Sequence, residues 1–308
     1  MNLKSILICP YSKKKLNKIR DHFVSVDKSN KYKINKKGIP LFYKENISQD
    51  AQIQKEHYDK IANIYEENLE YPHTKEYMTY LDKQFLNLFE NHKINILAEL
   101  CCGTGEAVKM LKKRYDYAIG IDVSEKMLSF AYDKKNKKNI QFIQADALRT
   151  PFKDNTLDTV VVLGGIHHLN DRQKFFTEIS RILKPKGSFF WREPVDDFFL
   201  WRYIRKIIYR ISPVLDHKTE SPLRYKETIR QLKKCDLEVN NWNTIGFFGF
   251  CFFMNSDVLW FNRFFRFLPF IKQITRYSTK IDHFITSLKF MKNNGLIVVG
   301  SAKKMPNI

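Results

Sequence analysis

The sequence has little of what a secreted or membrane-spanning protein needs. Its five cysteines, among 308 residues, are odd in number and unevenly spaced, which argues against a disulfide framework and for a reducing compartment. The apolar run at residues 6–9 is too short for the hydrophobic region of a signal peptide. Glycine (11) and proline (10) are scarce while 44% of the residues are hydrophobic, so the chain can bury a core. We therefore expect a folded, cytoplasmic protein of one large or two modest domains.

Acidic residues are also scarce, and the resulting positive charge is unevenly distributed. Lys and Arg number 53 against 33 Asp and Glu, a net charge of +20. Residues 1–50 carry 12 basic and 4 acidic groups and residues 195–295 carry 17 and 9, whereas residues 51–194 are nearly balanced at 22 and 20. The two basic flanks are therefore expected to face nucleic acid or an anionic membrane surface. A general lysine bias of the source proteome is the alternative.

The rest of the chain alternates apolar runs with stretches of helical periodicity. A glycine loop interrupts the pattern after residue 100. Helices are predicted over residues 106–115, from the N-cap Ser124 through Tyr132, and over residues 171–183. Strands are predicted at residues 94–100, 117–121, 140–143, 159–163, 188–191, 237–245 and 295–301. This alternation predicts an α/β fold, with a doubly wound, mostly parallel, seven-stranded sheet covered by helices on both faces.

Small and acidic residues stand at the ends of the first three predicted strands. Glu99, Gly103 and Gly105 mark the first, Asp122 the second and Asp146 the third. Ligands of such sheets bind beyond the carboxyl ends of the strands, near the point where the strand order reverses. The glycines let the backbone approach a ligand, Asp122 can accept hydrogen bonds from ribose hydroxyls, and Asp146 can accept one from an adenine amino group. The pattern therefore predicts a nucleoside site.

A dinucleotide site is the main rival, because Asp122 also lies about 20 residues beyond the loop. However, the third glycine of that motif is missing after Gly103-Thr104-Gly105. Glu106, at the start of the next helix, would also repel a pyrophosphate. The ligand should therefore lack a pyrophosphate.

At these positions the sequence resembles the class I S-adenosylmethionine-dependent methyltransferases, in particular the type 11 group that includes quinone C-methyltransferases. The matching stretches follow the family's order and lie at residues 99–106, 120–128, 144–147, 151–154, 157–163, 167–169 and 181–187. The resemblance implies a Rossmann-like fold, an antiparallel last strand and S-adenosyl-L-methionine as cofactor. It also implies a set of cofactor-binding residues: Glu99, Gly103 and Gly105 for the methionine portion, Asp122 for the ribose, Asp146 and Ala147 for the adenine, Leu163 and Gly164 at the methyl end, and Tyr58, Tyr65, Cys101 and Val123 around them.

Two features qualify this site. Cys101 stands where the family usually has the first glycine of its loop, and we expect the loop to survive with a slightly altered backbone. Tyr58 and Tyr65 lie on a helix that resembles the family's covering helix, although packing on the sheet would explain them equally well.

His167 and His168 follow the fourth predicted strand and are the candidate catalytic residues. Methyl transfer needs a protein base only where the acceptor must lose a proton. The alternative is that both histidines simply begin the next helix. No Asp-Pro-Pro-Tyr or Asn-Pro-Pro-Tyr motif, which methylation of a base amino group would favour, follows this strand.

The N-terminal residues 6–44 resemble the small zinc-ribbon-like domain that activates or precedes some methyltransferases. Its zinc-binding forms carry paired cysteines, but here Cys9 stands alone with Ser12 in its partner's position. Because a tetrahedral zinc site needs about four N or S ligands, we predict a metal-free relic with a structural or docking role.

The C-terminal part adds two unusual segments. Residues 198–211 read as a basic amphipathic helix, and residues 247–270 hold ten of the 25 phenylalanines but too many polar residues for a spanning helix. The aromatic residues predict either the wall and lid of an apolar acceptor pocket or contact with an anionic membrane.

Together these features predict three regions: a small zinc-ribbon-like domain at residues 1–48, a cofactor-binding core at residues 49–194, and a substrate, lid and membrane-contact region at residues 195–308. We expect a methyltransferase for a lipophilic small molecule or lipid-linked acceptor, cytoplasmic with peripheral membrane contact. The alternatives are an RNA methyltransferase, which the bunched phenylalanines disfavour, and a non-catalytic cofactor-binding scaffold. Neither the acceptor atom nor the oligomeric state follows from the sequence.

Overall fold

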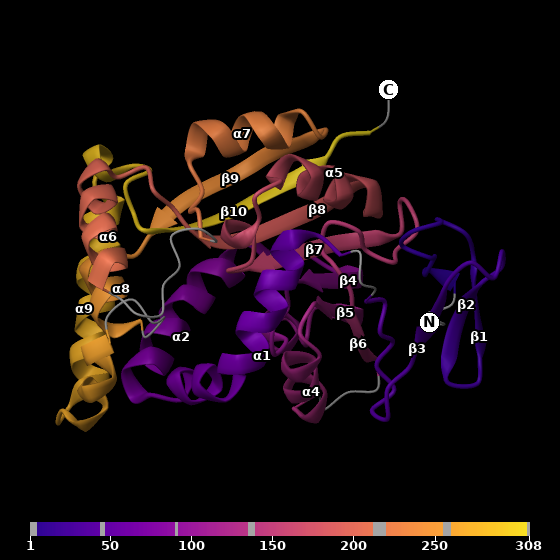
Figure 1. The fold of residues 1–308 in the computed structure, drawn as a ribbon. Helices are drawn as coiled ribbons and strands as arrows, with labels where there is room; N and C mark the ends of the chain where they lie inside the picture. Colours follow the sequence, from indigo (N-terminus) through magenta and orange to yellow (C-terminus); the bar gives the residue numbers. More distant parts are fainter. Residues whose placement is uncertain are drawn as a thin grey trace.

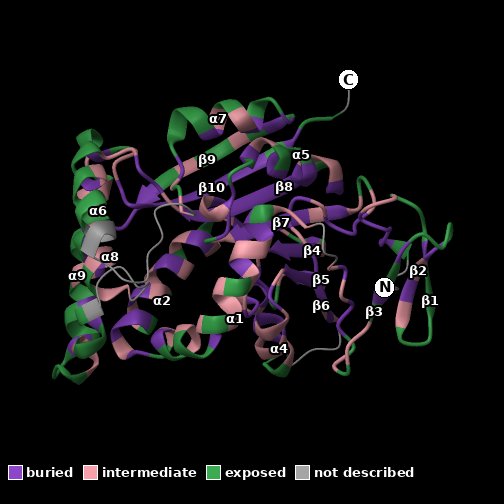
Figure 2. Ribbon diagram, in the orientation of Figure 1, coloured by how far each residue is buried: buried purple, intermediate pink, exposed green. Residues whose placement is uncertain are grey.

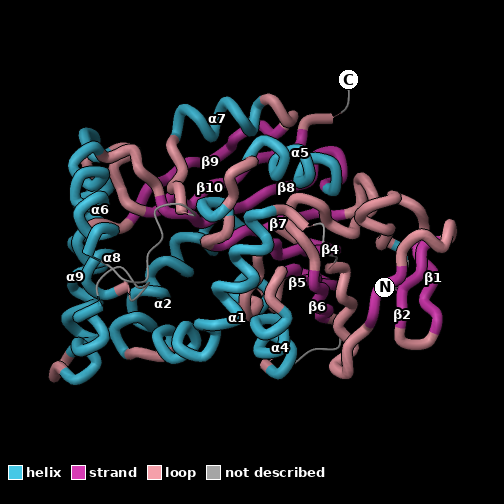
Figure 3. Tube along the Cα trace, in the orientation of Figure 1, coloured by secondary structure: helices cyan, strands magenta, loops and turns pink. Residues whose placement is uncertain are grey.

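The computed structural model describes residues 5–43, 47–89, 92–134, 139–211, 220–254 and 260–306. Within them the chain forms a seven-stranded sheet, a three-stranded sheet and helices that cover the larger sheet (Figures 1 and 3). The seven strands run in the order β6-β5-β4-β7-β8-β10-β9, and only β10 is antiparallel to its neighbours. The strands are β4 (Ile94–Leu100), β5 (Tyr115–Asp122), β6 (Ile140–Gln144), β7 (Leu157–Leu163), β8 (Leu183–Pro194), β9 (Leu237–Ile245) and β10 (Ile297–Lys304). The predicted mostly parallel sheet with an antiparallel last strand is confirmed.

Side chains of successive strand residues enter two separate hydrophobic clusters, one on each face of the sheet. Val160 and Val162 belong to the first cluster and Val161 to the second; Trp191 and Phe190 divide in the same way. This alternation is the period-two pattern of a strand that is buried on both faces. It explains why the strands could be recognised as continuous apolar runs.

Helices on both sides complete the layers (Figure 2). The first cluster includes side chains of α5 and α7, and the second includes side chains of α2, α3 and α4. The helices of the core are α1 (Gln49–Leu69), α2 (Pro72–Leu86), α3 (Glu106–Met110), α4 (Glu125–Asp133), α5 (Arg172–Ile182) and α7 (Tyr225–Lys233), with short 3-10 helices η2 (Asn87–Phe89) and η3 (Ile166–His168).

One helix is shorter than the sequence predicts. The pattern over residues 106–115 favours a helix of ten residues, but α3 ends at Met110 and Tyr115 already begins β5. Tyr115 pairs with Ile94 in the parallel register, and its hydroxyl donates to the carbonyl oxygen of Val108 at 2.9 Å. The pairing of Tyr115 with β4 requires the helix to end before it.

The N-terminal residues form the three-stranded antiparallel sheet, which Figure 1 shows at one end of the molecule. Its strands are β1 (Leu16–Ile19), β2 (His22–Ser25) and β3 (Lys31–Lys33). The Cys9 thiol lies 3.1 Å from the Tyr32 hydroxyl and accepts a hydrogen bond from the amide of Ser12. In the described residues no three His, Cys, Asp or Glu side chains lie together as metal ligands would. The zinc-ribbon likeness stays a prediction.

The C-terminal part adds helices at the opposite end of the molecule from this small sheet (Figure 1). They are α6 (Phe199–Ile211), α8 (Phe248–Phe253), η4 (Trp260–Phe267), α9 (Ile271–Ser287) and η5 (Lys289–Met291). The segment between β9 and β10 thus contains α8, η4, α9 and η5. Among the described helices, none is both long and apolar enough to span a bilayer.

Candidate active site

A cavity of about 590 Å³ opens at the carboxyl ends of β4, β5, β6 and β7, under helices α1 and α2. Its volume is within the range of small-molecule sites, about 300–1,000 Å³. It lies beside the junction of β4 with β7, where the strand order reverses, as expected for a doubly wound sheet.

The loop after β4 forms the floor of this cavity and has an unusual backbone. Cys101, Gly103 and Gly105 all have positive φ, at 53°, 49° and 79°. Cys101 thus adopts the left-handed conformation that glycine favours. The predicted slight change of the loop backbone relative to the family stays a prediction. A β-carbon at Gly165 would lie only 2.5 Å from the Cys101 β-carbon, so Gly165 provides the space that the cysteine needs.

Glu99 is buried at the end of β4 and supports the helix that follows the loop. Its two carboxylate oxygens accept hydrogen bonds from the amides of Ala107 and Val108, at 2.9 and 2.8 Å. Burial raises the pKa of Glu99 to about 8, and the two amide donors oppose this shift. Glu99 lines the cavity, but in this structure its oxygens fix the first turn of α3.

Asp122 holds the glycine loop and the next helix together. One oxygen accepts from the amide of Gly103 at 2.8 Å and the other from the amide of Ser124 at 2.9 Å. Burial raises the pKa of Asp122, against the effect of these amides. Ser124 in turn caps α4 by accepting from the Met127 amide, as its sequence position predicts. Asp122 is thus held rigidly at the cavity wall.

Asp146 lies on the same cavity wall, but its carboxylate already has partners. It accepts hydrogen bonds from the amides of Leu148 at 2.8 Å and Ser48 at 3.0 Å. Ser48 is the N-cap of α1, so Asp146 joins the third strand end to the covering helix. Sequence reasoning missed this second contact, because nothing local to Asp146 or Ser48 indicates it.

Helix α1 is attached across the cavity at two further points. The Asp50 carboxylate accepts two hydrogen bonds from Asn170, at 2.8 Å from its amide and 2.5 Å from its side chain. Asp59 accepts from the Ser124 hydroxyl at 2.6 Å and pairs with Lys55. These attachments hold α1 over the strand ends.

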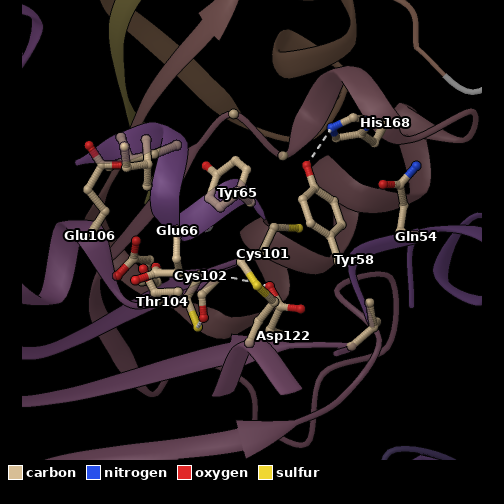
Figure 4. A pocket seen from close by; sticks show the side chains of 18 of the residues that line it. Gln54, Tyr58, Tyr65, Glu66, Cys101, Cys102, Thr104, Glu106, Asp122 and His168 are labelled. Carbon is tan, nitrogen blue, oxygen red and sulfur yellow. Dashed lines mark hydrogen bonds between the residues drawn. The ribbon is translucent and has the colours of Figure 1, made fainter. Parts of the chain in front are cut away.

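The side chains of Tyr58 and Tyr65 on α1 enter the cavity, with their rings edge-to-face and 5.9 Å apart. The Tyr58 hydroxyl lies 3.4 Å from the Nε2 atom of His168, and Figure 4 shows the two side chains pointing toward one another. Tyr58, Tyr65 and His168 therefore form one wall of the cavity.

The two candidate histidines occupy different environments. The Nδ1 atom of His167 lies 2.8 Å from the carboxylate of the fully buried Glu193. Burial lowers the pKa of His167 to about 3 and raises that of Glu193 to about 7. A neutral His167 therefore donates its Nδ1 proton to Glu193. His167 does not line the main cavity, whereas His168 does.

A smaller cavity, of about 220 Å³, adjoins the main one. Trp201, Phe250 and Met254 supply part of its apolar lining, and His167 and Arg205 part of its polar lining. The two cavities share eight residues: Tyr58, Tyr65, Leu69, Met78, Glu106, Leu163, Gly164 and His168.

Arg192 lines the smaller cavity and forms ion pairs with two residues of the main cavity. Sequence analysis did not identify it. It is buried and forms ion pairs with Asp82 on α2 at 2.7 Å and with Glu106 on α3 at 2.5 Å. In the sequence, Arg192 could be noticed because it stands beside Glu193 at the end of β8. Its ion-pair partners lie 110 and 86 residues away along the chain, so the sequence does not indicate them.

The charge of the main cavity permits a test of the cofactor that the resemblance implies. Eight acidic residues line it against three lysines, in a protein with a net charge of +20. This lining suits a cationic sulfonium and disfavours a pyrophosphate. Gly164 has φ of 67° and nothing within 4 Å of the position of a β-carbon, so its backbone is open to a ligand. The residues present fit S-adenosylmethionine.

Eleven of the twelve predicted cofactor-binding residues line the main cavity. Gly105 does not line it; a β-carbon there would meet the ring of Phe142 at 3.2 Å. The eleven that line the cavity are Tyr58, Tyr65, Glu99, Cys101, Gly103, Asp122, Val123, Asp146, Ala147, Leu163 and Gly164.

The fold and the site are those expected of a class I methyltransferase domain, and comparison with known proteins agrees with this expectation. Residues 98–191 match the family model described as a methyltransferase domain. The chain is 32% identical over 148 residues to the demethylmenaquinone methyltransferase of Staphylococcus carnosus, covering 47% of this chain and 58% of that protein. For the enzyme of the same name from Lactobacillus johnsonii the values are 34% over 114 residues, covering 34% and 46%. The chain thus spans about half the length of these relatives.

A solved structure extends the similarity in fold. A SAM-dependent methyltransferase from Thermotoga maritima superposes with a TM-score of 0.54 at 17% identity, covering 81% of this chain and 99% of that chain. Residues 98–191 thus match a methyltransferase domain, and most of the chain shares the fold of a solved methyltransferase. S-adenosylmethionine is the cofactor that this domain implies.

Proposed function

We propose that the protein transfers a methyl group from S-adenosylmethionine to a lipophilic small-molecule or lipid-linked acceptor. The observation that carries the proposal is the pair of adjoining cavities. One is acidic and suits the cationic cofactor, and the other has apolar side chains from α6 and α8 in its wall. Tyr58, Leu163, Gly164 and His168 belong to both, so the methyl group would pass between them there.

The residues of the main cavity would divide the cofactor between them. Asp122 would accept hydrogen bonds from the ribose hydroxyls, and Asp146 with Ala147 would contact the adenine. Glu99 and Gly103 would shape the region for the methionine portion, with Gly105 supporting the turn. When bound, the cofactor supplies an already activated methyl group, so the protein's main task is to align the acceptor.

His168 is the better candidate for a base, if the acceptor must lose a proton. It lies at the shared wall, whereas His167 is held by Glu193 and has a pKa lowered to about 3. Tyr58 would orient His168 through their 3.4 Å contact. His167 would then act as a positioning residue of the acceptor cavity.

The relatives favour a ring-bearing lipid as acceptor. The relatives from Staphylococcus carnosus and Lactobacillus johnsonii are named demethylmenaquinone methyltransferases, and a demethylmenaquinone is a quinone. A cavity of about 220 Å³ would take only the ring of such a molecule, with any chain extending outside. The proposal includes a cytoplasmic location and peripheral contact with an anionic membrane, where such an acceptor resides.

Calorimetry with S-adenosylmethionine tests the cofactor site. We expect Asp122→Asn to weaken binding about 10- to 100-fold, because it removes the charge from a buried hydrogen-bond acceptor. Asp116→Asn is the matched control, since Asp116 lies exposed on the same strand outside the cavity. Equal affinity of the Asp122→Asn variant and the wild type would contradict the assigned site.

Incubation of the protein with methyl-labelled cofactor and a total cell extract tests the acceptor. We expect label in the organic fraction. Label only in RNA would replace the proposal with an RNA methyltransferase, which the positive charge favours. Cofactor binding without labelling of any fraction would favour a non-catalytic scaffold.

A further inference from the structure

We propose that the outward surface of α6, α8, η4 and α9 is a docking face for an anionic lipid bilayer. We call it the outer helical face and define it as the exposed apolar side chains of residues 199–207 and, as far as the structure describes them, of residues 248–284. Sixteen of the 22 exposed large hydrophobic side chains in the described residues lie in these two segments. Such a concentration marks an interaction surface, because soluble proteins rarely expose contiguous apolar patches of this kind. The choice of a bilayer as occupant rests on the proposed lipophilic acceptor.

Helix α9 has its apolar stripe on the outside. Ile274, Tyr277, Ile281 and Phe284 recur at helical spacing on one side and are between 46% and 67% exposed. The buried side carries polar residues instead, including Asp282. This arrangement is the reverse of a surface helix in an ordinary soluble domain.

Buried hydrogen bonds fix α9 in this orientation. Asp282 is fully buried and accepts a hydrogen bond from the Tyr77 hydroxyl of α2 at 2.6 Å. It also accepts from the amides of Phe247, Gly249 and Phe250 around the start of α8, at 2.9 to 3.2 Å. Rotation of α9 to bury its apolar stripe would leave these donors and the carboxylate unpaired, which is costly inside a protein. These buried hydrogen bonds therefore fix the apolar stripe of α9 on the outside.

Helix α6 repeats the pattern beside α8. Trp201 is buried at the smaller cavity and Arg205 pairs with Glu220 at 3.7 Å, whereas Tyr203 and Ile207 are 64% and 58% exposed. The ring of Phe198, just before α6, lies 5.5 Å from that of Phe247, just before α8. Figures 1 and 2 show α6 and α9 along the same end of the molecule, with much of their surface exposed.

The charges around the outer helical face complement anionic lipid. Lys206, Lys272 and Lys280 are exposed, and Lys206 and Lys280 lie beside the rings of Tyr203 and Tyr277. In α6, α8, η4 and α9 as the structure describes them, Asp282 is the sole acidic residue, and it is buried. A second copy of this chain would bring a net charge of +20 against the same basic face, so a bilayer fits better than a dimer.

The outer helical face also adjoins the acceptor cavity. Trp201 of α6 and Phe250 of α8 line that cavity, while neighbouring side chains of the same helices face outward. A bilayer seated on this face would lie next to the helices that wall the cavity, so a lipid-linked acceptor could reach it without crossing water.

Sedimentation with vesicles tests the inference, using the full chain without cofactor. The vesicles contain phosphatidylcholine alone or equal parts of phosphatidylcholine and phosphatidylglycerol. We expect binding to the anionic vesicles, reduced at least tenfold by combining Ile281→Gln with Phe284→Gln. We expect Lys280→Glu to reduce binding by about fivefold or more. Ile19→Gln and Lys18→Glu in the N-terminal sheet are the matched controls, since Ile19 and Ile281 are both 56% exposed.

The inference would be overturned by no binding to anionic vesicles, by equal loss in the N-terminal controls, or by a dimer in solution that the Ile281→Gln and Phe284→Gln changes dissociate. Binding of RNA that competes with the vesicles and needs the same side chains would also overturn it. Calorimetry with S-adenosylmethionine on the same samples separates the two proposals. Vesicle binding without cofactor binding would contradict the proposed function alone, and the reverse result would contradict the outer helical face alone.

Discussion

The main cavity and the outer helical face place their polar and apolar groups in opposite ways. In the cavity, acidic side chains such as Asp122 lie at the wall and are held by backbone amides. At the outer helical face, the acidic Asp282 is turned inward to hold the helices, and aromatic side chains are presented to the outside. The first region therefore suits the proposed cationic cofactor, and the second suits the proposed anionic bilayer.

The largest expected effect concerns the glycine loop under the cavity. We expect Gly165→Ala to lower the free energy of unfolding by about 3 kcal/mol, because the added β-carbon would lie 2.5 Å from that of Cys101. Adding Cys101→Gly should restore most of the loss, since it removes the opposing atoms and relieves a left-handed cysteine that costs about 1–2 kcal/mol. Urea unfolding of both single variants and the double variant measures the coupling.

Gly164→Ala is the control for this cycle. Gly164 has a positive φ but nothing within 4 Å of the position of a β-carbon, so the change should cost only the strain of about 1 kcal/mol. Cys101→Gly should not rescue it. If the effects of Gly165→Ala and Cys101→Gly simply add, then the contact between the two loops is not the reason for glycine at position 165.

A smaller effect should appear in the pH dependence of stability around His167 and Glu193. The pKa of His167 falls from 6.5 to about 3 on folding, so its contribution makes the protein more stable as pH rises between those values. The pKa of Glu193 rises from 4.5 to about 7, so its contribution makes the protein less stable as pH rises through that window. Between pH 4.5 and 6.5 the two slopes oppose each other, each at up to about 1.4 kcal/mol per pH unit.

Variants that remove one partner should separate these slopes. The His167→Gln variant keeps only the downward slope of Glu193, so its free energy of unfolding relative to wild type should fall as pH rises through this window. The free energy of unfolding of Glu193→Gln relative to wild type should rise. Chemical unfolding at several pH values measures both differences. Parallel profiles for the two variants would mean that the pair does not titrate as the geometry implies.

The sequence predicts the main cavity well because its determinants are local. Each strand is a short apolar run, and Gly103, Asp122 and Asp146 follow directly at the strand ends. What it could not predict are contacts between distant segments. Asp50 meets Asn170 across 120 residues, and Arg192 finds Asp82 and Glu106 only after the sheet is assembled. The helix predicted over residues 106–115 is confirmed only as far as Met110 for the same reason, because Tyr115 pairs with β4.

The outer helical face shows a different limit of prediction. Periodicity shows that a helix such as α6 is amphipathic, but it assumes that the apolar side is the buried side. Here Trp201 and Arg205 face inward, and Ile204 and Ile207 are exposed. The orientation depends on hydrogen bonds and ion pairs made by few polar residues, and a sequence pattern carries no signal for those.

The smallest expected effect tests this orientation directly. Ile281→Gln should change the free energy of unfolding by less than about 0.5 kcal/mol, because Ile281 is 56% exposed. Ile271→Gln on the same helix should cost about 3 kcal/mol, because Ile271 is 5% exposed and the new glutamine would bury its amide. Thermal or urea unfolding of the two variants compares the two sides of α9 with one substitution type. Equal costs would mean that α9 does not present its apolar stripe to the outside. The contrast between the buried Asp282 and the exposed aromatic side chains of the outer helical face would then be wrong as well.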